Sequence, residues 1–319
     1  MITTGIDVSK AKLDVFFNHM PHKKHETFSN TPQGIEAIIR RLPENAFVIF
    51  ESTGPYSKLL YKTLCEKRIK CCCTNPYKVL RFAQGMGRHA KTDKIDARIL
   101  AEYGDKAEPE PTQFKSDKDL ELHELVSTRD VLMHDIRAHK NRLEISFSSD
   151  KVNQVFLDVI QKLEEELFKI CQAIDDFMKQ NENYAKKKEQ LETIPGIGSV
   201  SAAAILAYGP EIGTVSGKQF SSLIGLAPRT KQSGSTLMHD HIGGGRPDLR
   251  KAWYMPALTA IKCNPEMRKF YDKLKAKGKS SKVAIVAVMR KMSGYANSVI
   301  KRQVNFEKEG KPSLPNLAA

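Results

Sequence analysis

The sequence contains no apolar run that approaches the roughly 20 residues needed for a membrane-spanning helix. Its amino terminus also lacks the basic segment followed by an apolar segment that is typical of a signal peptide. With 319 residues, 40% of them apolar and 28% charged, the composition is ordinary for a soluble globular protein. We therefore expect a cytoplasmic protein that has no membrane partner.

Cysteine is present without the spacing of a metal site. None of the six cysteines forms a pair separated by two residues, so a zinc-finger type of site is excluded. Three of them, Cys71 to Cys73, fall in a predicted strand, where alternation sends neighbouring side chains to opposite faces. We expect small buried residues in a reducing compartment.

Aromatic residues are scarce and the charge is uneven. Aromatics make up 8% of the chain, with a single Trp, so the sequence gives no strong signal for stacking on bases. Residues 214–319 contain 20 Lys or Arg residues and six acids, and their net charge of +14 equals that of the whole chain. A basic excess confined to one segment is typical of a protein that binds the phosphate backbone.

Four acids stand at positions that suit phosphate chemistry. Asp7 lies in a β-branched run that predicts the first strand of a hairpin. Glu51 ends an apolar run, at the carboxyl end of a predicted buried strand, where open α/β sheets place their sites. Asp93 and Asp96 are three residues apart, so both would lie on one face of a predicted helix.

Carboxylates gathered in this way repel each other unless a cation lies between them. Mg²⁺, or Mn²⁺, prefers hard oxygen ligands and leaves room for phosphate oxygens. Two such ions, about 3.5–4 Å apart, could stabilise the attacking and leaving oxygens of an in-line displacement. The alternative is that each acid is an ordinary surface or capping residue. The order of the four acids along the chain favours a ribonuclease-H-type fold.

The chain predicts three regions and a tail. Residues 1–106 alternate strands and helices and form an α/β domain with a mixed sheet, with helices at 32–42 and 56–67 and a mobile basic loop near residues 85–91. Prolines at alternate positions make residues 107–111 a linker. Residues 305–319 are expected to be disordered.

Residues 107–190 hold the linker and an antiparallel helical hairpin, about 45 Å long at 1.5 Å per residue. Apolar residues recur in it at steps of three or four, as in a coiled coil. The hairpin could pack within its own chain or serve as a dimerisation arm. Its narrow apolar stripe on an acidic surface favours self-association.

Residues 191–304 predict a mainly helical domain. Its tight turn, Pro195-Gly-Ile-Gly198, resembles a helix-hairpin-helix module, in which Gly196 and Gly198 would let backbone N–H groups approach a phosphate. A purely structural turn is the alternative. Downstream, Arg229 and Lys231 belong to a basic and flexible segment that also carries two serines.

The chain as a whole resembles the DEDD transposases of bacterial insertion sequences, the family of the Piv-type invertases, also known as bridge-RNA-guided recombinases. The resemblance spans nearly the whole sequence. The motifs that carry it are Gly5-Ile-Asp-Val-Ser-Lys10, Glu51-Ser-Thr-Gly54, Asn75-Pro76, Lys91-Thr-Asp-Lys-Ile-Asp-Ala-Arg98, Ile194-Pro-Gly-Ile-Gly198, Gly225-Leu-Ala-Pro-Arg229 and Ser233-Gly-Ser235.

The resemblance implies a site and a reaction. The four acids match the metal-binding acids of the family's RuvC-like domain, and Ser233 matches its nucleophilic serine. Such enzymes are understood to join the serine to DNA as a phosphoserine and to free a 3′-hydroxyl that later attacks on an exchanged strand. The resemblance also implies donor and target duplex DNA, a non-coding guide RNA, and a dimer or tetramer in which serine and acids come from different protomers.

Several alternatives stay open at this point. Ser235 is a rival nucleophile. The acids alone would also suit a hydrolytic RuvC-like endonuclease, and the basic segment would suit a nucleic-acid-binding protein without catalysis. The Gly5-Ile-Asp-Val-Ser9 stretch resembles the first phosphate loop of actin-like sugar kinases, but no second glycine-rich phosphate motif follows it.

Overall fold

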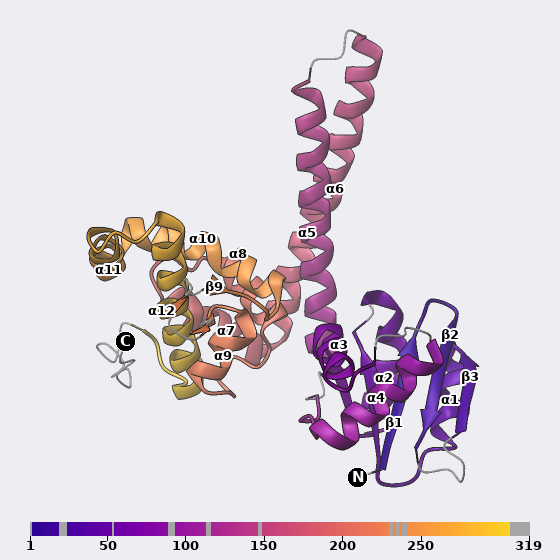
Figure 1. Cartoon of the computed structure of the whole chain (residues 1–319). Coiled ribbons are helices and arrows are strands. Elements are labelled where there is room, and N and C mark those ends of the chain that lie inside the picture. Colours follow the sequence, from indigo (N-terminus) through magenta and orange to yellow (C-terminus); the bar gives the residue numbers. More distant parts are fainter. Residues whose placement is uncertain are drawn as a thin grey trace. The chain divides into compact units, whose positions relative to one another are not determined.

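In the computed structural model the chain divides into two units, Met1–Lys115 and Ser116–Ala319. Figure 1 shows an α/β unit in indigo and purple and a mainly helical unit from magenta to yellow. Among the described helices, none is long and apolar enough to cross a membrane. The finer division at residues 106, 190 and 304 stays a prediction. The structure describes residues 2–18, 24–52, 54–88, 93–112, 116–145, 149–229, 232–233, 236–237 and 241–306.

The predicted mixed sheet forms the centre of the first unit. Its order is β3-β2-β1-β4-β5. β2 is antiparallel to β1 and β3, whereas β4 is parallel to β1 and β5. β1 and β2 form the predicted hairpin, in which Asp7 lies opposite Asp14. The strands are β1 (Ile2–Val8), β2 (Lys12–Phe17), β3 (Lys24–Ser29), β4 (Ala46–Glu51) and β5 (Cys71–Thr74).

Helices cover both faces of this sheet. On one face α1 and α2 bury residues such as Leu60 against Phe50 of the sheet. On the other face α3 and α4 bury residues such as Leu100 against Ile49. The unit is therefore a three-layer α/β structure. Its helices are α1 (Pro32–Ile39), the 3₁₀ turn η1 (Gly54–Ser57), α2 (Lys58–Glu66), α3 (Pro76–Gly85) and α4 (Asp93–Ala107).

Two helix boundaries differ from the prediction. Thr31 caps α1 as expected, accepting a hydrogen bond from the Gly34 N–H at 3.2 Å. The helix ends at Ile39 and continues to the predicted residue 42 as tighter turns, in which the N–H groups of Arg41 and Leu42 donate to the carbonyls three residues before them. Pro43 then disfavours helical backbone at Leu42. The start of the predicted helix at residue 56 is a 3₁₀ turn.

The sequence analysis made no prediction for the segment that forms α3, a helix that ends at Gly85, where the predicted basic loop begins. Residues 86–88 of that loop are not helical. The Asn75 side chain accepts a hydrogen bond from the Tyr77 N–H at 2.8 Å, and Pro76 takes the first helical position. This pair is a strong start signal for a helix. Residues 89–92 of the predicted loop lie outside the described residues.

The consecutive cysteines of β5 face opposite sides of the sheet, as predicted. Cys71 packs in the core under α1 and α2, and Cys72 packs in the core under α3 and α4. Burial raises the pKa of Cys71 to about 12 and also raises that of Cys72. The two thiols are therefore neutral core residues.

Helix α4 lies directly on β1. A Cβ added to Gly5 would lie 2.0 Å from the Ala97 carbonyl oxygen and 2.5 Å from the Ala101 nitrogen. Gly104 of α4 also lies close to the sheet, where a Cβ added to it would lie 2.7 Å from the side-chain Cγ1 of Ile49. Glycine within a strand or helix permits such backbone contact.

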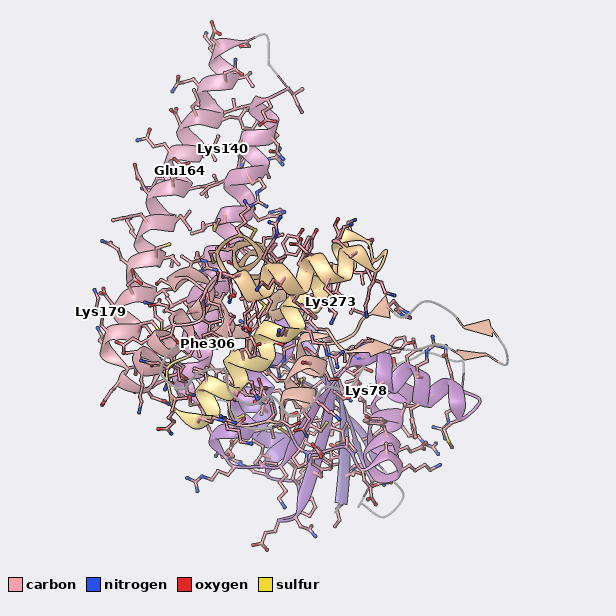
Figure 2. All side chains as sticks on the ribbon, turned by 90° about the vertical axis from the view of Figure 1, so that its left-hand side faces the viewer. Lys78, Lys140, Glu164, Lys179, Lys273 and Phe306 are labelled. Atoms are coloured by element: carbon pink, nitrogen blue, oxygen red, sulfur yellow. The ribbon has the colours of Figure 1, made fainter. Side chains whose placement is uncertain are left out.

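A pair of long helices opens the second unit. α5 (Asp117–Leu143) and α6 (Asp150–Gln180) have 27 and 31 residues, which gives about 40 and 46 Å at 1.5 Å per residue. Lys140 and Glu164 connect the two helices by an ion pair of 2.7 Å (Figure 2). Val126 reaches the core of the helical region. Coiled-coil packing of this pair stays a prediction.

Six further helices confirm that the carboxyl-terminal region is mainly helical. Their shared core includes the fully buried Trp253 and Phe220. The Phe306 N–H donates to Oγ1 of Thr193 at 2.9 Å, and residues 307–319 of the predicted disordered tail lie outside the described residues. The helices are α7 (Glu182–Glu192), α8 (Ser199–Tyr208), α9 (Gly217–Ile224), α10 (Pro247–Cys263), α11 (Pro265–Ala276) and α12 (Ser281–Arg302).

We expect Gly5→Ala to lower the free energy of unfolding of the first unit by about 1–3 kcal/mol, because the added methyl group must displace the backbone of α4. Urea denaturation followed by circular dichroism measures this loss. Gly85→Ala is the control, since no described atom outside its own helix backbone and chain neighbours lies within 4 Å of the added Cβ, and helix propensity predicts a gain of up to about 1 kcal/mol. Equal midpoints for wild type and Gly5→Ala would contradict the close packing.

Candidate active site

Asp7 and Glu51 lie on neighbouring parallel strands. The register pairs Ile6 of β1 with Phe50 of β4, so Asp7 and Glu51 are the next residues along the two strands. Matching positions on adjacent strands place their side chains on the same face of the sheet. Both acids are half-buried, and both lie at the carboxyl ends of their strands.

The same sheet face carries α4, which runs opposite to β1. Thr3 donates a hydrogen bond to Asp105 near the end of the helix, and Gly5 meets α4 earlier, at Ala97. A strand advances about 3.3 Å per residue and a helix about 1.5 Å, so two residues of β1 span four or five residues of α4. Asp7, which is two residues beyond Gly5, therefore faces the first turn of α4.

Asp93 and Asp96 belong to that first turn. Asp93 is the first residue of α4, and Asp96 is half-buried. The side chain of Asp93 lies outside the part of the chain that the structure describes. The backbone therefore brings the segments that carry the four acids to one end of one sheet face.

A set of carboxylates at such a position fits a hard divalent cation, which prefers oxygen ligands. Among the side chains that the structure describes, which do not include Asp93, no three His, Cys, Asp or Glu residues form a group that could hold a metal ion. A metal site made by the four acids stays a prediction.

Glu102 fixes α4 to the end of α3. Its carboxylate receives Nε of Arg98 at 2.9 Å and Nη1 of Arg88 at 2.9 Å. Burial opposes the ionisation of Glu102, but the hydrogen bonds from Arg98 and Arg88 outweigh it and lower the pKa. Arg88, from the predicted basic loop, thus helps to hold the acidic helix in place.

Ser233 lies in a β-hairpin that the sequence analysis did not predict, and the predicted flexibility of this segment stays a prediction. Ser233 pairs with Thr236 across the hairpin. The Gly-Ser dipeptide between them is the sequence signal that predicts such a turn. We call residues 228–242 the serine hairpin. Its nested strand pairs are β6 (Pro228–Arg229) with β9 (His241–Ile242), and β7 (Gln232–Ser233) with β8 (Thr236–Leu237).

The side chains of Arg229 and Ser233 lie outside the described part of the structure, as does the whole of Lys231. Contacts of Arg229 and Lys231 with nucleic acid therefore stay predictions. So does the nucleophilic role of Ser233.

The carboxyl-terminal end of the serine hairpin is fastened to α9. Gly225 ends α9 with a φ of 79°, and a Cβ there would lie 2.2 Å from the Gly244 carbonyl oxygen. The Arg246 N–H donates to the Leu223 carbonyl at 2.8 Å. The Arg246 guanidinium binds both carboxylate oxygens of Glu211, at 2.6 and 2.7 Å. The strands that carry Ser233 thus start from a fixed base.

Known proteins match the chain over both units. A family model of the DEDD type of insertion element IS110, described as a transposase, matches residues 4–146, and the model of the transposase IS116/IS110/IS902 family matches residues 188–272. The pilin gene-inverting proteins of Moraxella lacunata and Moraxella bovis are each 30% identical over 95% of this chain and 97% of their own length.

The chain belongs to the IS116/IS110/IS902 transposase family. It is therefore a DNA transposase or recombinase, and the family implies dependence on a divalent metal. An insertion element IS110 protein of Streptomyces coelicolor is 29% identical over 40% of this chain and 32% of its own length. The four acids fall within the first family match and Ser233 within the second.

The tight turn of this transposase uses its two glycines differently. Gly196 has a φ of 106°, and a Cβ there would lie 2.7 Å from the Pro256 carbonyl oxygen and 2.7 Å from the Ala260 Cβ. Packing on α10 therefore requires glycine at this position. Gly198 precedes α8 and, among the described atoms, has none within 4 Å of an added Cβ. A phosphate contact by either glycine stays a prediction.

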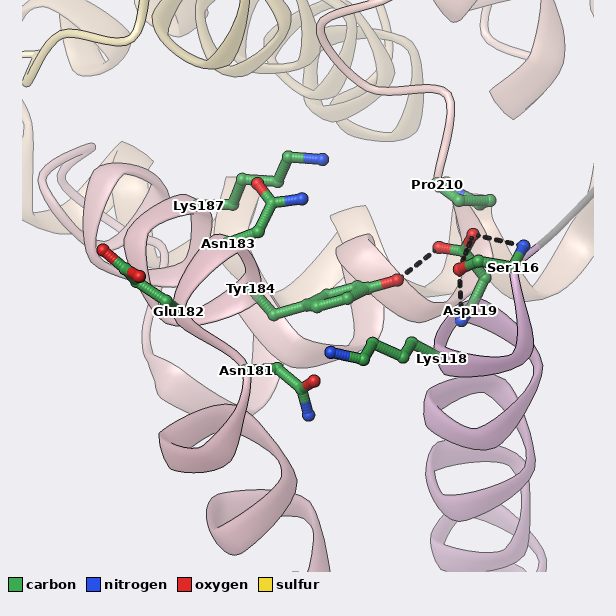
Figure 3. Close-up of a pocket in the computed structure, with 9 residues that line it drawn as sticks. All are labelled: Ser116, Lys118, Asp119, Asn181, Glu182, Asn183, Tyr184, Lys187 and Pro210. Carbon is green, nitrogen blue, oxygen red and sulfur yellow. Dashed lines mark hydrogen bonds between the residues drawn. The ribbon is translucent and has the colours of Figure 1, made fainter.

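The transposase also has a polar pocket of about 290 Å³ where α5 and α7 begin (Figure 3). The Tyr184 hydroxyl donates to Asp119 at 2.6 Å, and burial together with this bond raises the pKa of Tyr184. The bond braces the two helices. Among the residues that the structure describes, no predicted site residue lines the pocket, whose walls are Ser116, Lys118, Asp119, Asn181, Glu182, Asn183, Tyr184, Lys187 and Pro210.

We expect Arg246→Ala to loosen the serine hairpin and to raise trypsin cleavage after Arg229 and Lys231 several-fold, because the bidentate bond to Glu211 is lost. Limited proteolysis with mass spectrometry measures the change. Arg268→Ala serves as the control, since it removes an exposed pair with Asp272 (3.0 Å) that contributes at most about 0.5 kcal/mol. If the two variants are cleaved at equal rates, the anchoring role of Arg246 is wrong.

Proposed function

We propose that this transposase exchanges DNA strands through a covalent phosphoserine–DNA intermediate and with the help of a divalent metal. The observation that carries the proposal is the packing of α4 on β1 and β4, which gathers four acidic positions at one end of a sheet face. Ser233 of the serine hairpin is the proposed nucleophile. Membership of the transposase family supports both assignments.

We assign the first unit to the RuvC-like, ribonuclease-H-like fold. Three antiparallel strands followed by two parallel strands, in the order β3-β2-β1-β4-β5, support this assignment. The acids then occupy the first strand, the end of the fourth strand and a following helix. In such a fold the catalytic groups meet at the carboxyl ends of the parallel strands.

The proposed reaction exchanges one phosphate ester for another. Oγ of Ser233 attacks a DNA phosphorus, the new O–P bond forms, and the bond from phosphorus to the 3′ oxygen breaks. The serine proton passes to the departing oxygen, which becomes a 3′-hydroxyl. In the second step the 3′-hydroxyl of an exchanged strand attacks the phosphoserine and restores the serine hydroxyl. Neither step consumes water.

Asp7, Glu51, Asp93 and Asp96 are the proposed ligands of Mg²⁺ or Mn²⁺, which supplies charge stabilisation to the phosphoryl oxygens. A serine hydroxyl is a poor nucleophile without activation. In the hairpin the residue opposite His241 of β9 is Arg229 and not Ser233. A metal held by the four carboxylates is therefore the better candidate for activating the serine.

The acids and the serine belong to different units of the chain, and we propose that each active site is composite. The protein then acts as a dimer or tetramer in which one protomer supplies the acids and another supplies Ser233. Exposed apolar side chains along the α5–α6 pair support self-association, since Val131, Val155 and Phe168 are 58, 60 and 64% exposed.

We also propose that a structured non-coding RNA selects the donor and target duplexes. Contacts between a protein and phosphates carry no sequence information, whereas base pairing with a guide does. The basic carboxyl-terminal third of the chain supports binding of both nucleic acids.

Two substitutions separate the proposed roles. Ser233→Ala should abolish a covalent protein–DNA adduct because it removes the nucleophile, whereas Ser235→Ala should retain the adduct. Asp7→Asn should lower adduct formation by at least about 10²-fold, because it weakens metal binding, and should leave DNA affinity unchanged. Denaturing electrophoresis of labelled duplex after incubation with RNA and Mg²⁺ detects the adduct.

The alternative functions give different results in the same assay. A hydrolytic endonuclease would cut DNA without any adduct, and its activity would survive Ser233→Ala. A binding protein without catalysis would leave the duplex intact with either metal. An adduct that survives Ser233→Ala and disappears in Ser235→Ala would move the nucleophile to Ser235.

The guide is tested separately. We expect a discrete non-coding RNA to copurify with the expressed protein when the flanking DNA of its gene is present, and we expect ribonuclease treatment to abolish adduct formation. Sequencing of the bound RNA and reconstitution with the synthetic transcript measure both effects. Full activity of the RNA-free protein would show that no guide is needed.

A further inference from the structure

The turn between α11 and α12 carries an unusual density of positive charge. Five of the ten residues from 273 to 282 are lysines, and no acid follows Asp272 before Glu307. The lysines are all exposed. Asp272 is already paired with Arg268 at 3.0 Å. We call this cluster the lysine corner, and its members are Lys273, Lys275, Lys277, Lys279 and Lys282.

No ion pair neutralises the corner within the described residues. Lys275 reaches the hydroxyl of Ser281, with Nζ to Oγ at 3.2 Å, and that hydroxyl carries no charge. Three lysines of α6 differ, since Lys162, Lys169 and Lys179 each lie within 4 Å of an acid on their own helix. A solvated charged face of the ordinary kind mixes both signs, and the corner does not.

Helix stabilisation accounts for only part of this cluster. Lys273 and Lys275 lie in the last turn of α11, where cations favour the helix dipole. Lys282 lies in the first turn of α12, where the dipole disfavours a cation and no acid compensates for it. Lysines gathered in this way repel one another in the free protein. A polyanion would relieve that repulsion.

The backbone of the corner is held in a defined shape. Gly278 makes the turn with a φ of 78°, and the Ser280 side chain caps α12 at the Val283 N–H, 3.4 Å away. Behind the turn, the Lys291 ammonium lies 4.9 Å from the centre of the Phe270 ring and ties α11 to α12. The five ammonium groups are thus presented from a rigid support.

We propose that the lysine corner is a contact surface for the phosphate backbone of duplex DNA. None of its five lysines is among the residues that the family resemblance assigns to catalysis. Its flexible, exposed ammonium groups suit phosphates, which they meet as point charges without reading bases. The proposal depends on the proposed function in one respect only, namely that the polyanion bound by the lysine corner is DNA.

The test compares two triple variants of the full chain that lose the same charge. One replaces Lys273, Lys277 and Lys282 with Gln, and the control replaces the three paired lysines of α6, named above, with Gln. The affinity for a labelled DNA duplex is measured by fluorescence anisotropy over a series of KCl concentrations. An RNA duplex is measured in parallel, and thermal melting checks that each variant is folded.

We expect the slope of log K against log[KCl] to become shallower by about 0.9 for each lost phosphate contact, or by about 2.7 for three contacts, in the corner variant. The control should keep the wild-type slope, although it has lost the same three positive charges as the corner variant. Equal slopes for both variants would overturn the proposal, as would a change seen with RNA alone. Because binding is measured without cleavage, absence of the serine adduct would leave this result unaffected.

Discussion

The contact between α4 and β1 at Gly5 is the constraint on which the candidate active site depends. Because no side chain separates the two backbones there, the helix must follow the strand closely and in the opposite direction. Its first turn then falls where β1 and β4 end, beside Asp7 and Glu51. A larger residue at Gly5 would shift the acidic turn and the strand-end acids relative to each other. Glu102, with its two arginines, holds the same helix from the outer side.

The serine hairpin is supported by a different kind of interaction. Gly225 provides the close backbone approach, and the Arg246–Glu211 pair provides a charged clamp at the point where the chain returns to the helical core. Each half of the proposed site is thus built on a rigid element of its own unit. A composite site requires rigid supports of this kind, because each reacting group must already be oriented when the group from the other protomer arrives.

Two surfaces of the second unit differ in whether their lysines are paired with acids. Along α6, Lys162, Lys169 and Lys179 pair with neighbouring acids, and the helix offers apolar side chains such as Val155 for contact. At the α11–α12 turn the lysines have no such partners among the described residues. The first surface suits another protein chain, whereas the second suits a polyanion.

Sequence alone determined the strand hairpin, the strand-end position of Glu51, the two-faced cysteine strand and the long helices, because each depends on local periodicity or capping. It also identified the family, since the motifs are contiguous. It missed α3 and the pairing of strands around Ser233, where short start and turn signals were given too little weight. Only the tertiary structure decided that α4 runs back along β1, because the reason for Gly5 is a backbone about a hundred residues away.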